Sequence, residues 1–269
     1  MIDVPAREPF AAADLAPEAL RARWPVRSQG DAGTCVAHAV ASCVELLLAL
    51  RAGTMPEPLS HEYLYRLIRD PAWPWAAAQK PRSWDKGGVK LEQALAILRE
   101  HGIASEAEFP DWTDPGLLPA APTRTRAALR RCDALAYADR PKENERNVAG
   151  WPDSPDTPAG WAAAQLANDY PVVLALGAPR EDWWGAARTS GRLPEPPADA
   201  KPGGDGHAVC LIGLQPDAGD PTRARFTFRN SWSVAWGTAG YGSMSDAYLN
   251  AYAWEMLALA PGGGRMSAA

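Results

Sequence analysis

The sequence predicts an α+β protein with two lobes. Apolar residues recur at helical spacing over 34–52, 60–70 and 91–101, all in the first half of the chain. From about residue 127 onward, runs that favour strands dominate and are separated by clusters of Pro, Gly and Asp. We therefore expect a helical lobe and a β-rich lobe, with a cleft at their interface where a functional site can form.

The elements are taken in chain order. The alanine-rich run after Thr34 is apolar on all sides and predicts a buried helix. Leu59-Ser60 is expected to start the next helix, at 60–70. Strands are expected at 134–138, 172–177, 207–214, 225–229 and 240–244, with one helix at 158–168 among them. The expected divisions are a short N-terminal extension at 1–23, a helical lobe at 24–125, a β-rich lobe at 126–255 and a C-terminal tail at 256–269.

Composition excludes several classes of function. The chain has 269 residues, 46% of them hydrophobic, and a net charge of −5, as in ordinary globular proteins. The sequence contains no large basic patch, so we expect no nucleic-acid partner. We also expect no run of 18 apolar residues that could span a membrane. The four His are widely spaced and no metal-binding pattern is present, so neither a metal nor another cofactor is expected. The frequent Arg, Ala, Pro and Gly are typical of a GC-rich bacterial genome.

The most informative residue is Cys35, in the segment Gln-Gly-Asp-Ala-Gly-Thr-Cys-Val-Ala-His that begins at Gln29. Its position predicts the first turn of the buried helix, where free N–H groups and the helix dipole favour a thiolate. A helix N-terminus together with an imidazolium can lower a Cys pKa from about 8.5 to about 3.5–7.5. We therefore predict that Cys35 is an activated nucleophile with a lowered pKa.

Three further polar residues fit the needs of acyl transfer. His207 can accept the thiol proton and return it to a leaving amine, and Asn230 can hydrogen-bond the far ring nitrogen to fix the ring. Gln29 can turn its side-chain N–H₂ toward an oxyanion that the backbone N–H of Cys35 also stabilises. These residues are the catalytic candidates.

At these positions the chain resembles the papain-like (C1) cysteine peptidases. The resemblance continues through the segment 230–242, which contains Asn-Ser-Trp, Trp-Gly and Gly-Tyr, and it covers roughly 24–249. It implies the papain-like fold, with a barrel-like β lobe and the active site in the cleft between the lobes. It also implies hydrolysis of peptide bonds in peptide or protein substrates through a thioester acyl-enzyme, without a cofactor.

The resemblance also implies substrate-binding residues. Gly87-Gly88 stands ahead of a helix that ends in Gly-Ile, as in the family, where the second Gly pairs with an extended substrate and a side chain would block that approach. Gly88 and its neighbour Gly87 are therefore expected to bind substrate. Trp232, and Gly206 at the rim of the specificity pocket, complete the expected set.

The chain departs from the plant and lysosomal members at Ala32, where they carry a Cys that forms a disulfide bridge, and at Val36, where they carry a Trp. No Cys precedes Gly87 closely, so we expect no bridge, a bacterial type of enzyme and a reducing compartment. The N-terminus does not resemble a signal peptide, and cytoplasmic residence is expected, with signal-less secretion left open. The few residues before Trp24 are too few for a folded inhibitory prosegment, so a regulatory partner protein is one expected restraint.

Some alternatives remain open. The same nucleophile could transfer the acyl group to an amine, as in a transpeptidase, cyclase or transglutaminase-like enzyme, or the chain could be a non-catalytic interaction module. His38 could rival His207 as the base, although a core position fits it better. The other cysteines, Cys43, Cys132 and Cys210, are expected in the core.

Three loops stand outside the predicted elements. Segments 70–85 and 179–206 are rich in Trp and Pro, and 141–158 is expected to be a solvated surface loop. Trp183-Trp184 is expected mainly to fill the core. The loop that contains this pair ends next to His207, so it is the best candidate for shaping substrate access.

Overall fold

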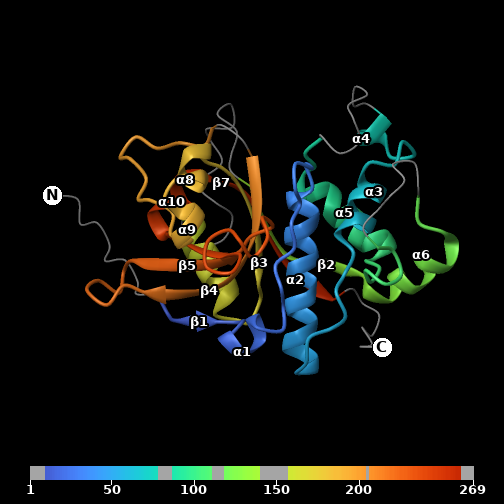
Figure 1. Ribbon diagram of the computed structural model, residues 1–269, viewed down its shortest axis with the longest axis horizontal. Helices are drawn as coiled ribbons and strands as arrows, with labels where there is room; N and C mark the ends of the chain where they lie inside the picture. Colours follow the sequence, from blue (N-terminus) through green and yellow to red (C-terminus); the bar gives the residue numbers. More distant parts are fainter. Residues whose placement is uncertain (1–9, 78–86, 111–117, 140–156, 204–205, 262–269) are drawn as a thin grey trace.

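The computed structural model describes residues 10–77, 87–110, 118–139, 157–203 and 206–261. Helix α2 (Cys35–Ala52) lies between a β-sheet and a group of helices (Figure 1). Strands β3 (Val172–Gly177) and β4 (Gly206–Pro216) contact it on one side, and helices α3 (His61–Ile68) and α5 (Leu91–His101) contact it on the other. The two-lobed α+β prediction is confirmed.

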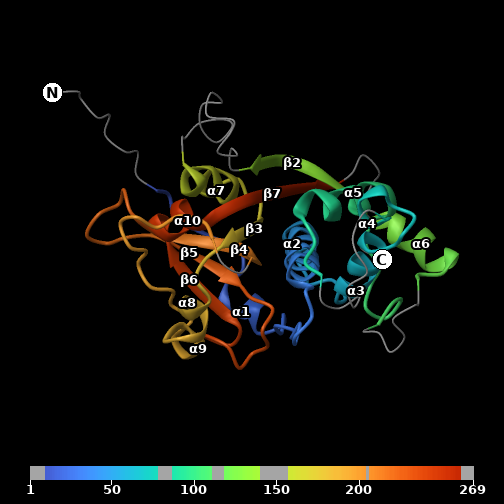
Figure 2. The same cartoon turned by 90° about the horizontal axis from the view of Figure 1, so that it is seen from above.

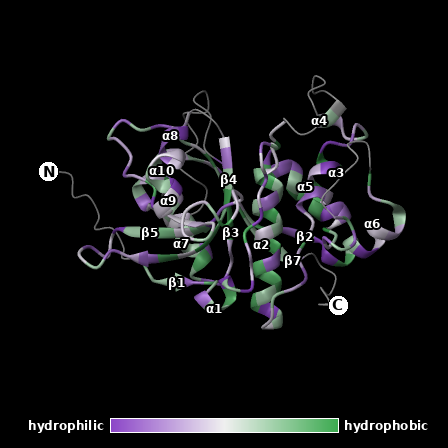
Figure 3. Cartoon of the chain, in the orientation of Figure 1, coloured by the Kyte–Doolittle hydropathy of each residue, from purple (hydrophilic) through white to green (hydrophobic). Residues whose placement is uncertain are grey.

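Helix α2 is the core helix of the molecule. Every residue from Val36 to Ala49 is buried, and Figure 3 shows hydrophobic colour along much of the helix. It is 18 residues long with a mean hydropathy of 1.7, and 78% of it is buried inside the protein. By length and mean hydropathy this helix meets the criteria for a membrane span, although Glu45 and Arg51 interrupt its apolar run. A helix packed on both sides needs apolar residues all round, so a core helix meets the same criteria.

The remaining helices are short. They are α1 (Glu18–Arg21), α4 (Pro74–Ala77), α6 (Ala121–Ala127), α7 (Pro158–Leu166), α8 (Arg180–Trp184), α9 (Ala187–Ser190) and α10 (Asp246–Tyr252), with a 3-10 turn at Ala128–Arg130. The predicted start of α3 is confirmed, because the Ser60 side chain accepts a hydrogen bond from the Tyr63 N–H at 3.0 Å.

All neighbouring strands of the seven-stranded sheet are antiparallel. The other strands are β1 (Ala13–Asp14), β2 (Cys132–Asp139), β5 (Ala224–Arg229), β6 (Tyr241–Ser245) and β7 (Ala253–Pro261). The order is β2-β7-β3-β4-β5-β6, and β1 pairs with β4. Seen from above in Figure 2, β7 extends from the sheet past α2 to β2, near α5.

Two expected divisions do not match the structure. The expected tail at 256–269 includes part of β7, whose residues Met256–Leu259 are buried between β2 and β3. The expected extension at 1–23 contains β1, which is paired in the sheet. The Ala, Leu, Met and Glu of β7 favour helices, and strand pairing overrides that preference.

The register of the sheet positions two candidate residues at one edge. Cys210 in β4 pairs with Arg229 in β5, and the two strands are antiparallel. His207 at the start of β4 and Asn230 directly after β5 therefore meet at the same edge, beside the first turn of α2.

Candidate active site

Cys35 is the first residue of α2, and Thr34 caps the helix without a side-chain hydrogen bond. Burial raises the pKa of the Cys35 thiol above its ordinary value of 9.0, and the backbone N–H groups of Ala208, Val36 and Cys35 oppose that shift. The predicted lowering of the pKa is therefore wrong for this structure, because desolvation of the thiolate outweighs the hydrogen-bond donors around it.

His207 is oriented by Asn230, as the sequence predicts. The Nε2 atom of His207 lies 2.8 Å from Oδ1 of Asn230, and this oxygen also accepts the Ser231 N–H at 2.8 Å. Because an amide oxygen only accepts, Nε2 carries the hydrogen of the neutral imidazole. Nδ1 is then the unprotonated nitrogen and the one available as a base.

Aromatic rings enclose His207. Trp232 stacks on the imidazole with ring centroids 4.4 Å apart, and Trp183 meets it edge to face at 5.1 Å. Trp236 donates from Nε1 to the Trp183 carbonyl at 3.0 Å and so holds the second ring in place. Burial lowers the pKa of His207 to about 4, and the bond to Asn230 opposes the shift. At neutral pH the site therefore holds a thiol and a neutral imidazole.

Gln29 is held by the segment that follows Asn230. Its Oε1 accepts from the Ser231 hydroxyl at 2.5 Å, and its backbone N–H donates to the Ser231 carbonyl at 2.8 Å. Its Nε2 donates to the Ala32 carbonyl at 2.7 Å. A side-chain amide has two N–H bonds, so one donor remains for a developing oxyanion.

The two glycines expected to bind substrate lie beside the loop that precedes Cys35. A Cβ on Gly33 would come within 2.9 Å of Gly87 and 3.1 Å of Gly88, so the two backbones pack directly together. The Arg69 guanidinium covers Gly87, since a Cβ there would come within 2.2 Å of it and would have to displace it. A Cβ on Gly88 would meet nothing within 4 Å, so its open face is accessible to an extended chain.

Gly206 lies against Trp254. A Cβ on Gly206 would come within 2.7 Å of the Trp254 ring, and one on Gly177 within 2.1 Å. The small residue before His207 is therefore required by the packing of this ring. Trp254 carries no motif that the sequence analysis could have recognised.

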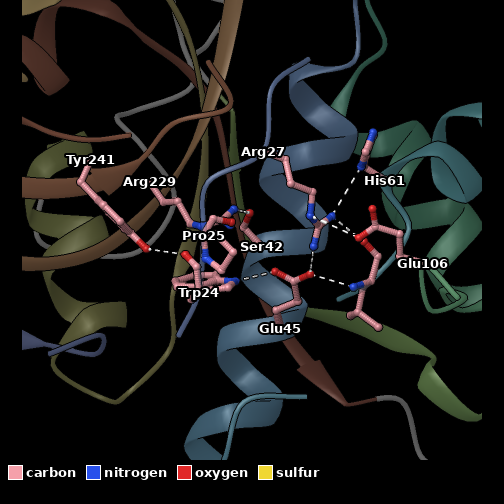
Figure 4. Close-up of polar contacts among 10 residues, drawn as sticks. Trp24, Pro25, Arg27, Ser42, Glu45, His61, Glu106, Arg229 and Tyr241 are labelled. Atoms are coloured by element: carbon pink, nitrogen blue, oxygen red, sulfur yellow. Dashed lines mark hydrogen bonds and ion pairs between the residues drawn. The ribbon is translucent and has the colours of Figure 1, made fainter. Parts of the chain in front are cut away.

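A buried polar network aligns α2 with the chain on both sides (Figure 4). The Glu45 carboxylate pairs with Arg27 and accepts from Trp24 Nε1 at 2.6 Å and from the Leu59 N–H at 2.7 Å. On the sheet side, Arg229 donates to the Ser42 hydroxyl at 2.6 Å. The network connects the chain before Gln29, and the strand before Asn230, to the helix of Cys35.

His38 is a core residue. Its Nδ1 lies 3.0 Å from the Thr34 carbonyl, and its ring stacks on His61 at 3.6 Å between centroids. Burial lowers the pKa of His38 to about 3. The other three cysteines are buried, and all four thiols are free. Among the residues that the structure describes, no group of three or more His, Cys, Asp or Glu could hold a metal ion.

Sequence reasoning missed two residues that support the site. Trp183 was expected mainly as core filling, and its ring contacts His207 directly; Ser231, which holds Gln29, was noted only as part of a motif. The first Trp-rich loop falls partly, and the predicted surface loop at 141–158 mostly, outside the described residues.

Comparisons with known proteins show the family and the fold of the chain. The family model described as papain family cysteine protease matches residues 14–261. Xylellain, a cysteine protease from Xylella fastidiosa, is 20% identical with a TM-score of 0.64, covering 94% of this chain and 86% of its own. Bromelain from Ananas comosus, solved with the E64 inhibitor, is 18% identical with a TM-score of 0.57, covering 92% and 97%.

A digestive procathepsin L 3 from Tenebrio molitor is 18% identical with a TM-score of 0.59, covering 95% of this chain and 73% of its own. No curated protein sequence matches the chain. At these identities the solved structures support the fold, and the family model supplies the assignment over nearly the whole chain. The chain belongs to the papain family of cysteine proteases.

Proposed function

We propose that Cys35, His207, Asn230 and Gln29 carry out the peptidase reaction of this family. The observation that carries the proposal is the hydrogen bond to the Cys35 thiol from the backbone N–H of Ala208, the residue that directly follows His207. The imidazole of His207 is in turn bound to Asn230. This arrangement supports the roles of nucleophile for Cys35, base for His207 and orienting amide for Asn230.

The resting thiol must lose its proton as it attacks. His207 Nδ1 takes the proton of Cys35 while the sulfur adds to the substrate carbonyl carbon. The oxyanion then receives hydrogen bonds from the Cys35 N–H and the Gln29 side chain. The imidazolium gives its proton to the leaving amine as the C–N bond breaks, and a thioester remains. Water, deprotonated by His207, attacks the thioester and releases the acid and the free thiol.

Gly88 and Trp232 are proposed to bind opposite ends of the substrate. The leaving amine must lie close to His207, because that imidazole protonates it, and Trp232 covers the imidazole. Gly88 lies beside Gly33, two residues before Cys35, and presents open backbone for the acyl part of the peptide. At the rim of the specificity pocket, the Trp254 ring occupies the space that a side chain at Gly206 would need.

We also propose that the protein is bacterial and works in a reducing compartment, in the cytoplasm. All four thiols are free, and three of them are buried. Free thiols are typical of proteins that work in a reducing compartment. The similarity to xylellain from a bacterium agrees with this origin.

Mass spectrometry of peptide-library products, made in ¹⁸O water, tests the function. Hydrolysis by the wild type predicts new carboxyl ends that carry one ¹⁸O atom, and Cys35→Ala should leave the library intact. Adding a primary amine distinguishes transfer from hydrolysis. Products joined to the amine without ¹⁸O would contradict hydrolysis as the main reaction, and an inert wild type would contradict the proposal as a whole.

A further inference from the structure

The ring of Trp184 extends the aromatic surface over His207 outward to solvent. Trp184 stacks on Trp232 with centroids 4.8 Å apart and an interplanar angle of 20°, and it is 42% exposed. Trp232 in turn stacks on the imidazole. The three rings form a continuous stack, with Trp232 in the middle, from the imidazole that protonates the leaving amine to the exposed ring of Trp184.

Two arginines lie at this outer ring. The guanidinium of Arg180 lies 5.8 Å and that of Arg188 5.7 Å from the centroid of Trp184, and both residues are exposed. Within the described part of the chain, neither is within 4.0 Å of a carboxylate. A stacked guanidinium keeps its N–H groups free at the ring edge, where they can bind a carboxylate.

The acidic residues of the same helix are directed elsewhere. Arg180 and Trp184 are four residues apart in α8 and share one face of the helix. Glu181 and Asp182 instead line a separate hollow of about 410 Å³ with Leu193 and other residues of the following segment. Asp182 also accepts from the Tyr248 hydroxyl at 3.0 Å. The charge that faces the end of the ring surface is therefore positive.

We infer that Trp184, Arg180 and Arg188 form a subsite for an acidic residue of the substrate, located after the cleaved bond in the part that leaves as the amine. This inference rests on the proposed function. Trp232 covers the residue directly after the cleaved bond, and Trp184 lies one ring further out. An Asp or Glu one or two residues after the cleaved bond can reach the guanidinium groups while its methylene groups lie against the exposed edge of the Trp184 ring.

The test uses three internally quenched peptides that differ only at the second residue after the cleaved bond, which is Glu, Gln or Lys. The wild type should cleave the Glu peptide with a kcat/KM about tenfold above the Lys peptide, with Gln between them, because two exposed ion pairs each contribute modestly. The preference should decrease as salt is added. In the double variant Arg180→Gln/Arg188→Gln the three rates should converge, with the Gln peptide unchanged.

Arg192→Gln is the matched control, since it removes the same charge from an exposed arginine that does not contact Trp184. It should keep the preference for Glu. Equal rates for the three wild-type reactions, a preference for Lys, or a Glu preference that survives in the double variant would overturn the subsite and leave the peptidase function standing. If the wild type cleaves none of the peptides or of the library above, the proposed function fails and the subsite fails with it.

A second measurement does not depend on turnover. In Cys35→Ala, fluorescence anisotropy of the labelled peptides should show tighter binding of the Glu peptide than of the Lys peptide, and the two arginine substitutions should abolish the difference. Equal binding of both peptides would count against the subsite.

Discussion

The two sides of the candidate active site are held by different kinds of interaction. The helix of Cys35 is fixed by buried charges and polar groups, with Glu45 and Arg27 at the centre. His207 is fixed by the Asn230 amide and by rings that exclude water. We therefore expect substitutions of the buried charged residues near the helix of Cys35 to lower the stability of the fold. Substitutions that admit water to the His207 imidazole should instead alter catalysis and its pH dependence.

The largest expected effect comes from the nucleophile. Cys35→Ala should lower kcat/KM by more than about 10⁴-fold, because no other thiol lies at the site. Cys43→Ala is the control and should retain activity, since Cys43 is fully buried. Measured peptide cleavage that survives in Cys35→Ala would remove the thiol from the mechanism.

Loss of the Glu45 carboxylate tests the charged side of the comparison. Glu45→Ala leaves the buried Trp24 Nε1 and Leu59 N–H donors without their acceptor and removes the buried partner of Arg27, which keeps Glu106 and the Leu59 carbonyl. It should lower the free energy of unfolding by about 3–5 kcal/mol. Glu92→Ala breaks an exposed pair with Lys90 and should change it by less than about 1 kcal/mol. Urea titrations measure the free energy of unfolding of both variants. Equal decreases would show that the buried network stabilises the fold no more than an exposed ion pair does.

Gln29 tests whether electrostatic stabilisation acts in the transition state. Gln29→Ala should lower kcat by about 10²–10³-fold with little change in KM, because its donor acts only on charge that develops during the reaction. Ser231→Ala should give a smaller loss of the same kind by releasing Gln29. A silent Gln29→Ala in steady-state kinetics would make this residue merely structural.

The acid limb of kcat/KM tests the enclosed imidazole. His207 cannot accept the thiol proton once it is protonated, so activity should fall as pH falls through its pKa of about 4. Trp183→Ala admits water and should move the midpoint upward, toward the ordinary value of 6.5. A wild-type midpoint above pH 6 would contradict the account of a dehydrated, neutral imidazole.

The histidines of the thiol side should appear in stability instead. Burial lowers the pKa of His38 to about 3 and that of His61 well below 6.5, so both stay neutral in the folded protein. The unfolded chain takes up their protons below about pH 6.5. The contribution of these two histidines to the free energy of unfolding should therefore be complete above about pH 6.5 and should decrease as pH falls toward 3. A constant free energy of unfolding between pH 7 and 4 would contradict this.

Local sequence patterns predicted much of the fold and the site. Helix α5 and strand β3 have the predicted bounds, because their periodicity and flanking glycines agree with their environment. The residues of the catalytic set carry signals in their own neighbours, so Asn230 could be paired with His207 before any geometry was known.

What was missed depends on contacts between distant segments. The strand β7 resembles a helix in composition, and only its pairing with β2 and β3 makes it a strand. Trp183 reaches His207 through a loop whose path no local pattern predicts. The pKa of Cys35 was misjudged because a helix N-terminus is visible in sequence, whereas the amount of protein around the sulfur is not.

The most direct test of the central claim is to trap the acyl-enzyme. An activated ester of a peptide acid makes deacylation the slow step, so a rapid acid quench followed by peptide mapping finds the acylated residue. We predict one acyl group on Cys35, absent from Cys35→Ala and present in Cys43→Ala. Acylation of another residue, or product release in the wild type with no acylated thiol at any quench time, would contradict the mechanism.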